Sequence, residues 1–253
     1  MAPPEKIMKK YNIGIIGYGD FTKVILEHLE PFAAMVVSSR SHKSGDAGFG
    51  ATFAPINEVL SQSIIIASIP SQFFEEFFSA HRKLINPDAL VIDVCSVKVK
   101  PLGILEEQLP NSCSIIGTHP LFGPASIEHN KGIQGLKCVV SKVRASEDTL
   151  ETLYQLLQEE LGLKIIHKTA DEHDKEMAHV MGLSHFIGRT MKSMDITTSE
   201  LSTLAYEDLL DMKRVQGEDS WDLFYSIMKE NPYTEEVIEQ FKRAQAQVIS
   251  KLI

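Results

Sequence analysis

Short, continuous apolar runs alternate with amphipathic stretches along the first two thirds of the chain. Runs that are unbroken, rather than alternately apolar and polar, are typical of strands buried on both faces of a parallel sheet. Helical periodicity fills the gaps at residues 21–29, 72–84 and 101–108, and again after Ser146, where leucines repeat on one face until Gly162. The predicted strands are residues 12–17, 34–38, 63–69, 89–94, 114–117 and 137–140. This β-α alternation predicts a Rossmann-like α/β domain, doubly wound around a mainly parallel sheet.

The pattern changes after about residue 166. No strand-like run follows Asp171, and helical periodicity predicts a set of about four helices. Their capping candidates are Asp171, Thr198, Glu218 and Thr234. The sequence therefore predicts two domains, residues 1–168 and residues 169–253, of which the second is all-helical. A unit of about 85 residues is small for its many apolar positions, so we expect it to dock on the first domain or to pair with a second subunit.

Composition narrows the classes of function. The chain has 253 residues, of which 43% are hydrophobic and 23% charged, as in ordinary globular proteins. A net charge of -9 argues against a nucleic-acid partner, which needs a basic surface. No run approaches the about 18 apolar residues of a membrane span, and no apolar segment follows the lysines of residues 1–10, so neither a membrane span nor a secretory signal is predicted. The scattered Cys95, Cys113 and Cys138 predict free thiols in a reducing cytoplasm.

A glycine turn follows the first predicted strand. Residues 13–22 read Ile-Gly-Ile-Ile-Gly-Tyr-Gly-Asp-Phe-Thr, so that Thr22 replaces the third glycine of the usual dinucleotide fingerprint. Gly17 permits a tight turn, and Gly19 lets the backbone approach a pyrophosphate at the N-terminus of the next helix. Such a turn alone is a weak signal, but its place in the first strand–helix unit favours a dinucleotide site. The candidate residues are Gly17, Tyr18, Gly19, Asp20 and Phe21.

The end of the second predicted strand bears on the choice of cofactor. An NAD site usually carries an acid about 20 residues after the turn, where it binds the ribose 2′-hydroxyl. Here Ser39, Arg40 and Ser41 occupy that position, and no carboxylate follows until Asp46. Hydroxyls and a guanidinium suit a 2′-phosphate. The alternative is a solvated basic loop, but the position favours NADP over NAD.

Polar residues also follow the next predicted strands. Ser68, Ile69 and Pro70 follow one strand, Ser96 follows the next, and His119 follows the one after. Ligands of open α/β sheets bind outside the carboxyl ends of the strands, so we expect these residues beside a nicotinamide. Asp93, inside its strand, is expected to be structural.

His119 is predicted to lie between a buried strand and a loop stiffened by Pro120 and Pro124. Histidine is the side chain whose unperturbed pKa lies near neutrality, so a positioned one is a candidate proton acceptor. The alternative is a histidine that only hydrogen-bonds within a turn, which is the commoner case for a lone histidine.

The first predicted helix of the second domain carries histidines at positions 173, 179 and 185. At about 100° per residue a spacing of six points them in three directions, so no metal site is predicted. His185 instead shares a stripe with Asp174, and Arg189 lies one turn beyond. Ser184 and Gly188 are small and would let another element approach closely. The stripe is either a polar face toward the cofactor site or an ordinary contact between helices.

Taken together, these segments resemble the prephenate/arogenate dehydrogenase family of tyrosine biosynthesis, nearly from end to end. The likeness is closest to the short, NADP-using arogenate dehydrogenases. The motifs that carry it are residues 93–98 (Asp-Val-Cys-Ser-Val-Lys), 118–124 (Thr-His-Pro-Leu-Phe-Gly-Pro), 172–174 (Glu-His-Asp), 184–185 (Ser-His) and 217–223 (Gly-Glu-Asp-Ser-Trp-Asp-Leu).

The resemblance implies an oxidative decarboxylation with NADP, in which hydride leaves the ring carbon that bears the 4-hydroxyl. His119 matches the family's catalytic histidine, Ser96 a serine that contacts the hydroxyl and the nicotinamide, and His185 a histidine facing the substrate. The resemblance also implies a homodimer formed by the helical domain, with the active site in the cleft between the domains.

Two departures from the family's pattern leave open whether the substrate is arogenate or prephenate. Both favour arogenate. Gly188 stands where bacterial prephenate enzymes often have a second histidine. Arg214 lies two positions out of register with their carboxylate-binding arginine, and Arg189 is the other candidate. A related oxidoreductase for another small cyclohexadienyl acid and a non-catalytic nucleotide-binding protein remain as alternatives.

Overall fold

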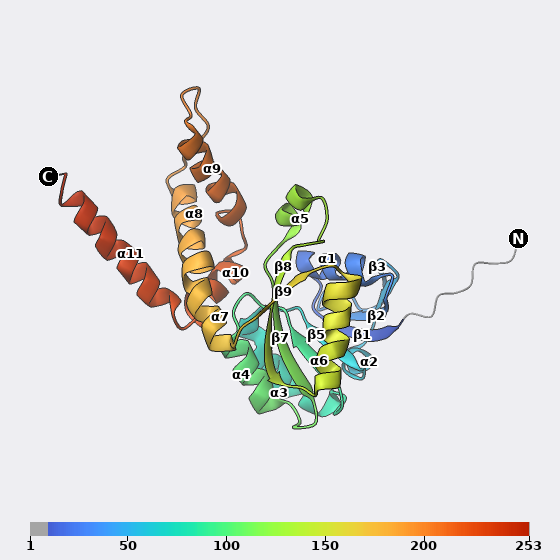
Figure 1. Cartoon of the computed structure of the whole chain (residues 1–253). Helices are drawn as coiled ribbons and strands as arrows, with labels where there is room; N and C mark the ends of the chain where they lie inside the picture. Colours follow the sequence, from blue (N-terminus) through green and yellow to red (C-terminus); the bar gives the residue numbers. More distant parts are fainter. Residues whose placement is uncertain (1–9, 253) are drawn as a thin grey trace, which may run out of the picture. The chain divides into compact units, whose positions relative to one another are not determined.

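The computed structural model describes residues 10–252, which form two compact units (Figure 1). The first unit contains the chain up to Ile69 together with Phe73–Cys95 and Leu102–His167. The second contains the chain from Lys168 onward and two short segments, Pro70–Gln72 and Ser96–Pro101. Pro70 and Ser96 therefore belong to the helical unit, although the sequence assigned them to the first domain. The prediction that residues 1–10 contain no secretory signal concerns a segment of which only Lys10 is among the described residues.

A nine-stranded sheet forms the first unit, in the order β3-β4-β2-β1-β5-β6-β7-β8-β9. Neighbouring strands are parallel except for two antiparallel pairs, β3 with β4 and β7 with β8. The predicted mainly parallel, doubly wound sheet is thus confirmed. The six predicted strands correspond to β1 (Tyr11–Ile16), β2 (Ala33–Ser38), β5 (Ile64–Ala67), β6 (Leu90–Asp93), β7 (Ser114–Pro120) and β8 (Lys137–Arg144), and the unpredicted ones are β3 (Gly45–Gly48), β4 (Ala51–Phe53) and β9 (Lys164–His167).

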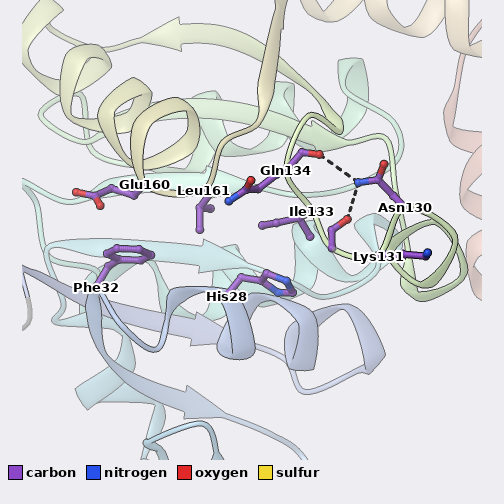
Figure 2. A pocket seen from close by; sticks show the side chains of 9 residues that line it. His28, Phe32, Asn130, Lys131, Ile133, Gln134, Glu160 and Leu161 are labelled. Atoms are coloured by element: carbon purple, nitrogen blue, oxygen red, sulfur yellow. Dashed lines mark hydrogen bonds between the residues drawn. The ribbon is translucent and has the colours of Figure 1, made fainter.

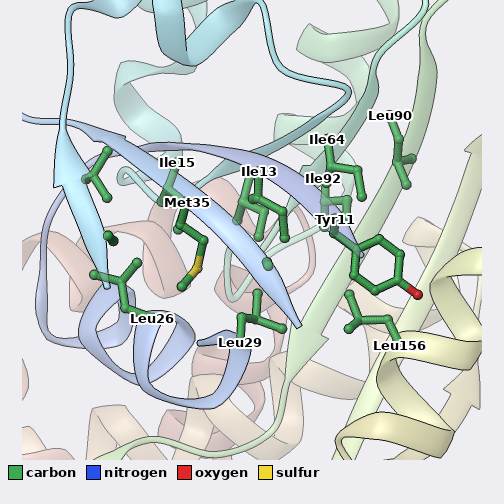
Figure 3. Close-up of a cluster of buried hydrophobic side chains, with 14 of the residues drawn as sticks. Tyr11, Ile13, Ile15, Leu26, Leu29, Met35, Ile64, Leu90, Ile92 and Leu156 are labelled. Atoms are coloured by element: carbon green, nitrogen blue, oxygen red, sulfur yellow. The ribbon is translucent and has the colours of Figure 1, made fainter. Parts of the chain in front are cut away.

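Helices cover the sheet and pack against it through apolar side chains. The core of the first unit joins strand side chains such as Ile13 and Ile15 with Leu26 and Leu29 of the first helix (Figure 3). Ser146 caps its helix as predicted, because its hydroxyl accepts the N–H of Thr149. The helices are α1 (Asp20–Leu29), α2 (Ile56–Leu60), α3 (Phe74–His81), α4 (Val99–Gln108), α5 (Pro124–Asn130) and α6 (Glu147–Tyr154), which continues as a π-helical segment, Gln155–Glu160.

One predicted boundary was wrong in a way that concerns the candidate site. β7 runs through to Pro120, and His119 pairs with Val139 of β8. His119 is therefore inside a strand and not in a loop after it. The antiparallel partner β8 supplies hydrogen bonds that extend β7 past the end of the apolar run. The sequence predicts a strand at β8, but nothing local in it indicates this antiparallel pairing.

From Lys168 onward, the described residues of the second unit contain helices joined by turns and irregular segments, and no strand. Its helices are α7 (Ala170–Met177), α8 (Ser184–Ser193), α9 (Leu204–Gln216), α10 (Trp221–Tyr225) and α11 (Thr234–Ile249), with π-helical segments at Ala178–Leu183 and Ser226–Glu230. No helix among residues 10–252 is long and apolar enough to cross a membrane.

The predicted helix caps of the second unit were wrong by a few residues. Hydroxyls of Thr169, Thr203 and Ser220 cap α7, α9 and α10, in place of the predicted Asp171, Thr198 and Glu218. Each of these hydroxyls accepts the N–H three residues later, which an N-cap side chain can reach from an extended backbone. α11 begins at Thr234 itself, with Tyr233 before it as the cap residue.

Candidate functional site

Gly17 and Gly19 shape the turn between β1 and α1 in different ways. Gly17 has a φ of +99°, and a Cβ there would lie 2.3 Å from the carbonyl oxygen of Ser68. Both the backbone angle and the closeness of the chain after β5 therefore require glycine. A Cβ on Gly19 would meet no atom within 4 Å, so the space in front of that residue is open. This open side at the N-terminus of α1 fits the approach of a pyrophosphate.

Thr22 explains why the turn lacks a third glycine. Its side chain is fully buried, and its hydroxyl donates to the carbonyl of Gly17 at 3.3 Å. The same oxygen accepts the N–H of Gly19 at 3.4 Å and lies 2.9 Å from Oγ of Ser68. Because the single proton of Thr22 goes to Gly17, the Ser68 hydroxyl is the donor in that pair. Thr22 thus ties the turn to the end of β5.

The other residues of the turn differ in exposure, since Asp20 is exposed whereas Tyr18 and Phe21 are partly buried. Tyr18 donates its hydroxyl to the carbonyl of Ala47 at 3.1 Å. Asp20 is exposed and forms an ion pair with Lys23 at 2.9 Å, and this contact raises the pKa of Lys23. The ion pair offsets a negative charge that would otherwise repel a pyrophosphate. Phe21 packs near α5, with its ring centroid 6.4 Å from that of Phe122.

The loop after β2 carries hydroxyls and cations but no carboxylate among residues 38–45. The hydroxyls of Ser39 and Ser41 lie 3.1 Å apart, and Lys43 donates to the carbonyl of Ser39 at 3.3 Å. The exposed guanidinium of Arg40 lies 5.4 Å from the ring centroid of Phe73. Asp46 accepts the N–H of Gly48 at 2.8 Å and so serves the turn of its own hairpin.

Three parallel strands bring candidate residues to one edge of the sheet. β5 ends before Ser68 and Ile69, β6 ends at Asp93, and β7 carries His119 near its carboxyl end. Asp93 accepts the N–H of Cys95 at 2.8 Å, a contact that shapes the turn after its strand. His119 is only 4% exposed.

The direction of His119 follows from its neighbours in β7. Thr118 and Pro120 line an apolar cavity of about 80 Å³ on the face that α1 and α6 cover. Because successive side chains of a strand point to opposite faces, His119 points to the other face. It is therefore separated from the cavity by the sheet.

A second hollow, of about 500 Å³, is lined by none of the predicted site residues (Figure 2). His28 comes from α1 and Phe32 from the turn between α1 and β2, while Asn130 is the last residue of α5 and Gln134 lies between α5 and β8. Asn130 donates to the carbonyls of Gly132 and Gln134 at 2.7 and 3.1 Å, which closes this loop on itself.

In the second unit, buried carboxylates hold the two short segments that follow β5 and β6. Asp174 of α7 accepts the N–H groups of Lys98 and Val99, just after Ser96, at 2.8 and 2.9 Å. Glu230 accepts hydrogen bonds from Ser71, beside Pro70, and from Lys100. Sequence reasoning missed both anchors, because the Asp174 and Lys98 contact spans 76 residues and the Glu230 and Lys100 contact spans 130 residues, and no local signal marks either.

His185 and Arg189 of α8 both contact Asp219. His185 is buried, with Nδ1 3.0 Å from the carbonyl of Met181 and Nε2 2.9 Å from Oδ2 of Asp219. Arg189 donates to the backbone carbonyl of Asp219 at 2.5 Å, and its guanidinium lies 4.3 Å from the ring centroid of Trp221. Its Nε is buried without a hydrogen-bond partner among the described residues. The unit therefore brings His185 and Arg189 together around Asp219.

Arg214 has a different environment. Its side chain is exposed, and it forms an ion pair with Asp211 one turn earlier in α9, at 3.2 Å. Gly188 lies against the same helix, since a Cβ there would be 2.9 Å from the carbonyl of Met212 and 3.2 Å from the N of Gly217. The expected close approach at Gly188 is thus confirmed, and it leaves no room for a histidine side chain.

Known proteins resemble both parts of the chain. Residues 36–162 match the family "Prephenate dehydrogenase, nucleotide-binding domain", and residues 190–253 match "TYRAAT1-like, C-terminal domain". Arogenate dehydrogenase 1, chloroplastic, of Arabidopsis thaliana is 28% identical over 92% of this chain and 38% of its own length. Arogenate dehydrogenase 2, chloroplastic, of the same plant is 27% identical over 92% of this chain and 67% of its own length. The chain therefore spans well under half of the first of these relatives.

Solved structures share the fold at low sequence identity. The Synechocystis arogenate dehydrogenase superposes with a TM-score of 0.71 at 18% identity, covering 95% of this chain and 91% of that one. A prephenate dehydrogenase from A. aeolicus, in complex with hydroxyphenyl propionate and NAD+, gives a TM-score of 0.70 at 17% identity, covering 98% and 92%. With half of its residues matching the family's nucleotide-binding domain and this fold around its glycine turn, the chain belongs to the prephenate dehydrogenase family.

Proposed function

We propose that this chain is an NADP-dependent dehydrogenase that oxidatively decarboxylates arogenate to tyrosine or prephenate to 4-hydroxyphenylpyruvate. The observation that carries the proposal is that the glycine turn and His119 lie at the carboxyl edge of one sheet, and that residues 36–162 match the family's nucleotide-binding domain. The names of the two Arabidopsis relatives support arogenate as the substrate.

The chain's own groups fit the requirements of this reaction. Bound NADP+ would supply a hydride acceptor for the ring carbon that bears the 4-hydroxyl. His119, held in a buried strand, accepts a hydrogen bond or the proton of that hydroxyl as the carbonyl develops. Ser96 contacts the same hydroxyl and the nicotinamide side. The ring carboxylate leaves as CO2, and the ring becomes aromatic.

Arg189 is the better candidate for the substrate carboxylate. Its Nε has no hydrogen-bond partner within the described part of the chain, and the aromatic rings of Trp221 and Phe224 flank its guanidinium at 4.3 and 5.2 Å. A guanidinium held in this way keeps its planar donors available for a carboxylate. Arg214 already pairs with Asp211 in solvent. Since both ring nitrogens of His185 face protein acceptors, its role is to shape this part of the site together with Asp219.

The loop after β2 supports NADP over NAD. Ser39, Arg40 and Ser41 offer two hydroxyls and a guanidinium at the place where an NAD enzyme usually has an acid. An acid there would repel a 2′-phosphate, whereas these groups can bind one.

The proposal is tested by mixing the protein with each of arogenate and prephenate and each of NADP+ and NAD+, and following the absorbance of the reduced cofactor. We expect the fastest turnover with arogenate and NADP+. Turnover with neither substrate would refute the proposed activity, and NADP+ binding in that case would favour a non-catalytic nucleotide-binding protein. Turnover with only another cyclohexadienyl acid would favour the related oxidoreductase.

We also propose that the helical unit pairs with a second copy of the chain. α11 buries Val237 and Ile238 in its first turns, but every residue from 242 to 252 is exposed, including Val248 and Leu252. Leu201 and Leu204 are 88% and 81% exposed. Apolar surface of this kind is commonly covered in an oligomer. Sedimentation equilibrium should give twice the chain mass, and a monomer at micromolar concentration would contradict this.

A reducing compartment such as the cytoplasm fits the cysteines. Among the described residues, Cys95, Cys113 and Cys138 form no disulfide, and burial raises the pKa of the Cys113 thiol. Cell fractionation tests this assignment, and recovery in plastids, as the names of the Arabidopsis relatives suggest for those proteins, would contradict it.

A further inference from the structure

Asp174 is a fully buried carboxylate whose oxygens accept hydrogen bonds from three donors. Oδ1 accepts the backbone N–H of Lys98 at 2.8 Å and Nδ1 of His173 at 2.8 Å, and Oδ2 accepts the N–H of Val99 at 2.9 Å. Its own backbone carbonyl accepts the side-chain amide of Asn231 at 2.8 Å. The side chain is 0% exposed, so all of these bonds are shielded from water.

These bonds replace an ordinary helix cap. Val99 is the first residue of α4, and the first N–H groups of a helix have no partner within the helix. An N-cap side chain commonly satisfies the N–H of the second or third helical residue, whereas here a carboxylate of α7, 75 residues along the chain, accepts the N–H of the first. Hydrogen bonds to an ionised carboxylate are roughly twice as strong as neutral ones.

The anchored N–H groups lie two and three residues after Ser96. Val97 and Lys98 between them are also buried, at 1% and 0% exposed. With consecutive Cα atoms about 3.8 Å apart, the segment has little slack, so the position of Asp174 largely determines where the backbone of Ser96 can lie. The carboxylate thus fixes a residue of the proposed active site without being able to touch the substrate itself.

We propose that Asp174 is a positioning residue that acts through Ser96, by holding the backbone of the segment between β6 and α4. The inference rests on the proposed function, in which Ser96 contacts the reacting hydroxyl. A purely structural role would make Asp174 only one more buried hydrogen-bonding group, so the test must separate the two.

The first arm of the test needs no enzyme activity. Asp174→Asn keeps one oxygen acceptor but turns an amide donor toward the other N–H group. We expect hydrogen exchange of the Lys98 and Val99 amides to become at least about tenfold faster, as the loss of one such bond implies. Exchange at the wild-type rate would overturn the proposal, whatever the substrate proves to be.

The second arm is a double-mutant cycle in kcat. If Asp174 acts through Ser96, Asp174→Asn lowers kcat about tenfold or more in the wild-type background and has almost no further effect in a Ser96→Ala background. The Kd of NADP+ should stay within about twofold, since the glycine turn is unchanged. Equal effects in both backgrounds would overturn the proposal.

Thr234→Val is the matched control. Thr234 is also 0% exposed in the helical unit, and its hydroxyl donates to the carbonyl of Ile227 at 3.0 Å. We expect this variant to lower the Tm while kcat and the exchange of the Lys98 and Val99 amides stay as in wild type. An equal fall in kcat in Thr234→Val and Asp174→Asn would mean that general destabilisation, and not a displaced Ser96, explains the lower kcat of Asp174→Asn.

Val99→Pro provides a second route should the Asp174 variant not fold. Proline is favoured at the first position of a helix, and its ring takes the place of the N–H that Oδ2 accepts, so this bond is lost and the Asp174 carboxylate must move away. We expect a fall in kcat that disappears in the Ser96→Ala background, and faster exchange at Lys98. A wild-type protein without turnover would refute the proposed function, while the exchange arm would still decide whether Asp174 holds this segment.

Discussion

Replacing Gly17 with alanine should damage both folding and cofactor binding. An alanine at this position would have to keep a φ of +99°, which only glycine adopts readily. Its methyl would also lie 2.3 Å from the carbonyl oxygen of Ser68 and 2.7 Å from Cγ2 of Ile69. Since one of these neighbours is backbone, the end of β5 must shift to make room.

The size of the effect follows from these two penalties. An unfavourable backbone angle costs about 1–3 kcal/mol, and overpacking of a well-packed site costs about another 1–3 kcal/mol. Their sum of about 2–6 kcal/mol corresponds to a fall in Tm of roughly 5–20 °C for a domain of this size.

Gly19→Ala is the matched control for the fold. A methyl at Gly19 would meet no atom within 4 Å, and its φ of -112° suits any residue. The free energy of unfolding should therefore change by no more than about 0.5 kcal/mol. The methyl would instead obstruct a pyrophosphate, and losing one charged hydrogen bond of about 1.5–3 kcal/mol lowers NADP+ affinity roughly tenfold to hundredfold.

The two variants are compared by thermal unfolding and by titration with NADPH, followed by its fluorescence. Gly17→Ala should lower both the Tm and the affinity, and Gly19→Ala only the affinity. Wild-type affinity in Gly19→Ala would refute the placement of the pyrophosphate, and a wild-type Tm in Gly17→Ala would refute the packing argument.

Other variants test the remaining assignments. Arg40→Ala should weaken NADP+ binding about tenfold or more and leave NAD+ binding unchanged; an equal loss for both in competition titrations would exclude a 2′-phosphate contact. Arg189→Lys should raise the substrate KM about tenfold or more, because lysine lacks the planar fork, whereas Arg214→Ala should change it less than twofold; the reverse order would move the carboxylate site to Arg214. Hydrogen bonds from the backbone and hydroxyl of Thr169 lower the pKa of Glu172 from its ordinary 4.5, so its stabilisation is present above that pH and is lost as the pH falls further. The Tm gap between wild type and Glu172→Gln should therefore shrink on acidification below pH 4.5, and a gap that stays constant would contradict this.

The fold was largely predictable because its central strands are continuous apolar runs. β5 and β6 are buried along their whole length, so their sequences could be distinguished from helices by length and flanking residues. β3 contains two glycines in four residues, and β9 has a lysine and a histidine at its ends, so neither carries a strand pattern. The antiparallel direction of β8 depends on its tertiary partner β7 and leaves no local signal.

The candidate site likewise contains residues that the local sequence predicts and partners that only tertiary packing determines. Gly17, Gly19 and Arg40 could be proposed from their distance to strand ends, which is a property of the local sequence. The partners of His185 and of the Ser96 segment could not, since Asp219 and Asp174 lie far from them in the chain. Such contacts are decided by helix packing, and a single sequence does not record it.

His119→Asn tests the central claim of the account most directly. Asparagine keeps hydrogen-bonding capacity but cannot take up a proton at neutral pH. NADP+ should bind as to wild type, within about twofold, while kcat with arogenate or prephenate falls about 10²–10⁴-fold, the usual contribution of a general base. Turnover within a few-fold of wild type would contradict the claim that His119 is the proton acceptor of this enzyme.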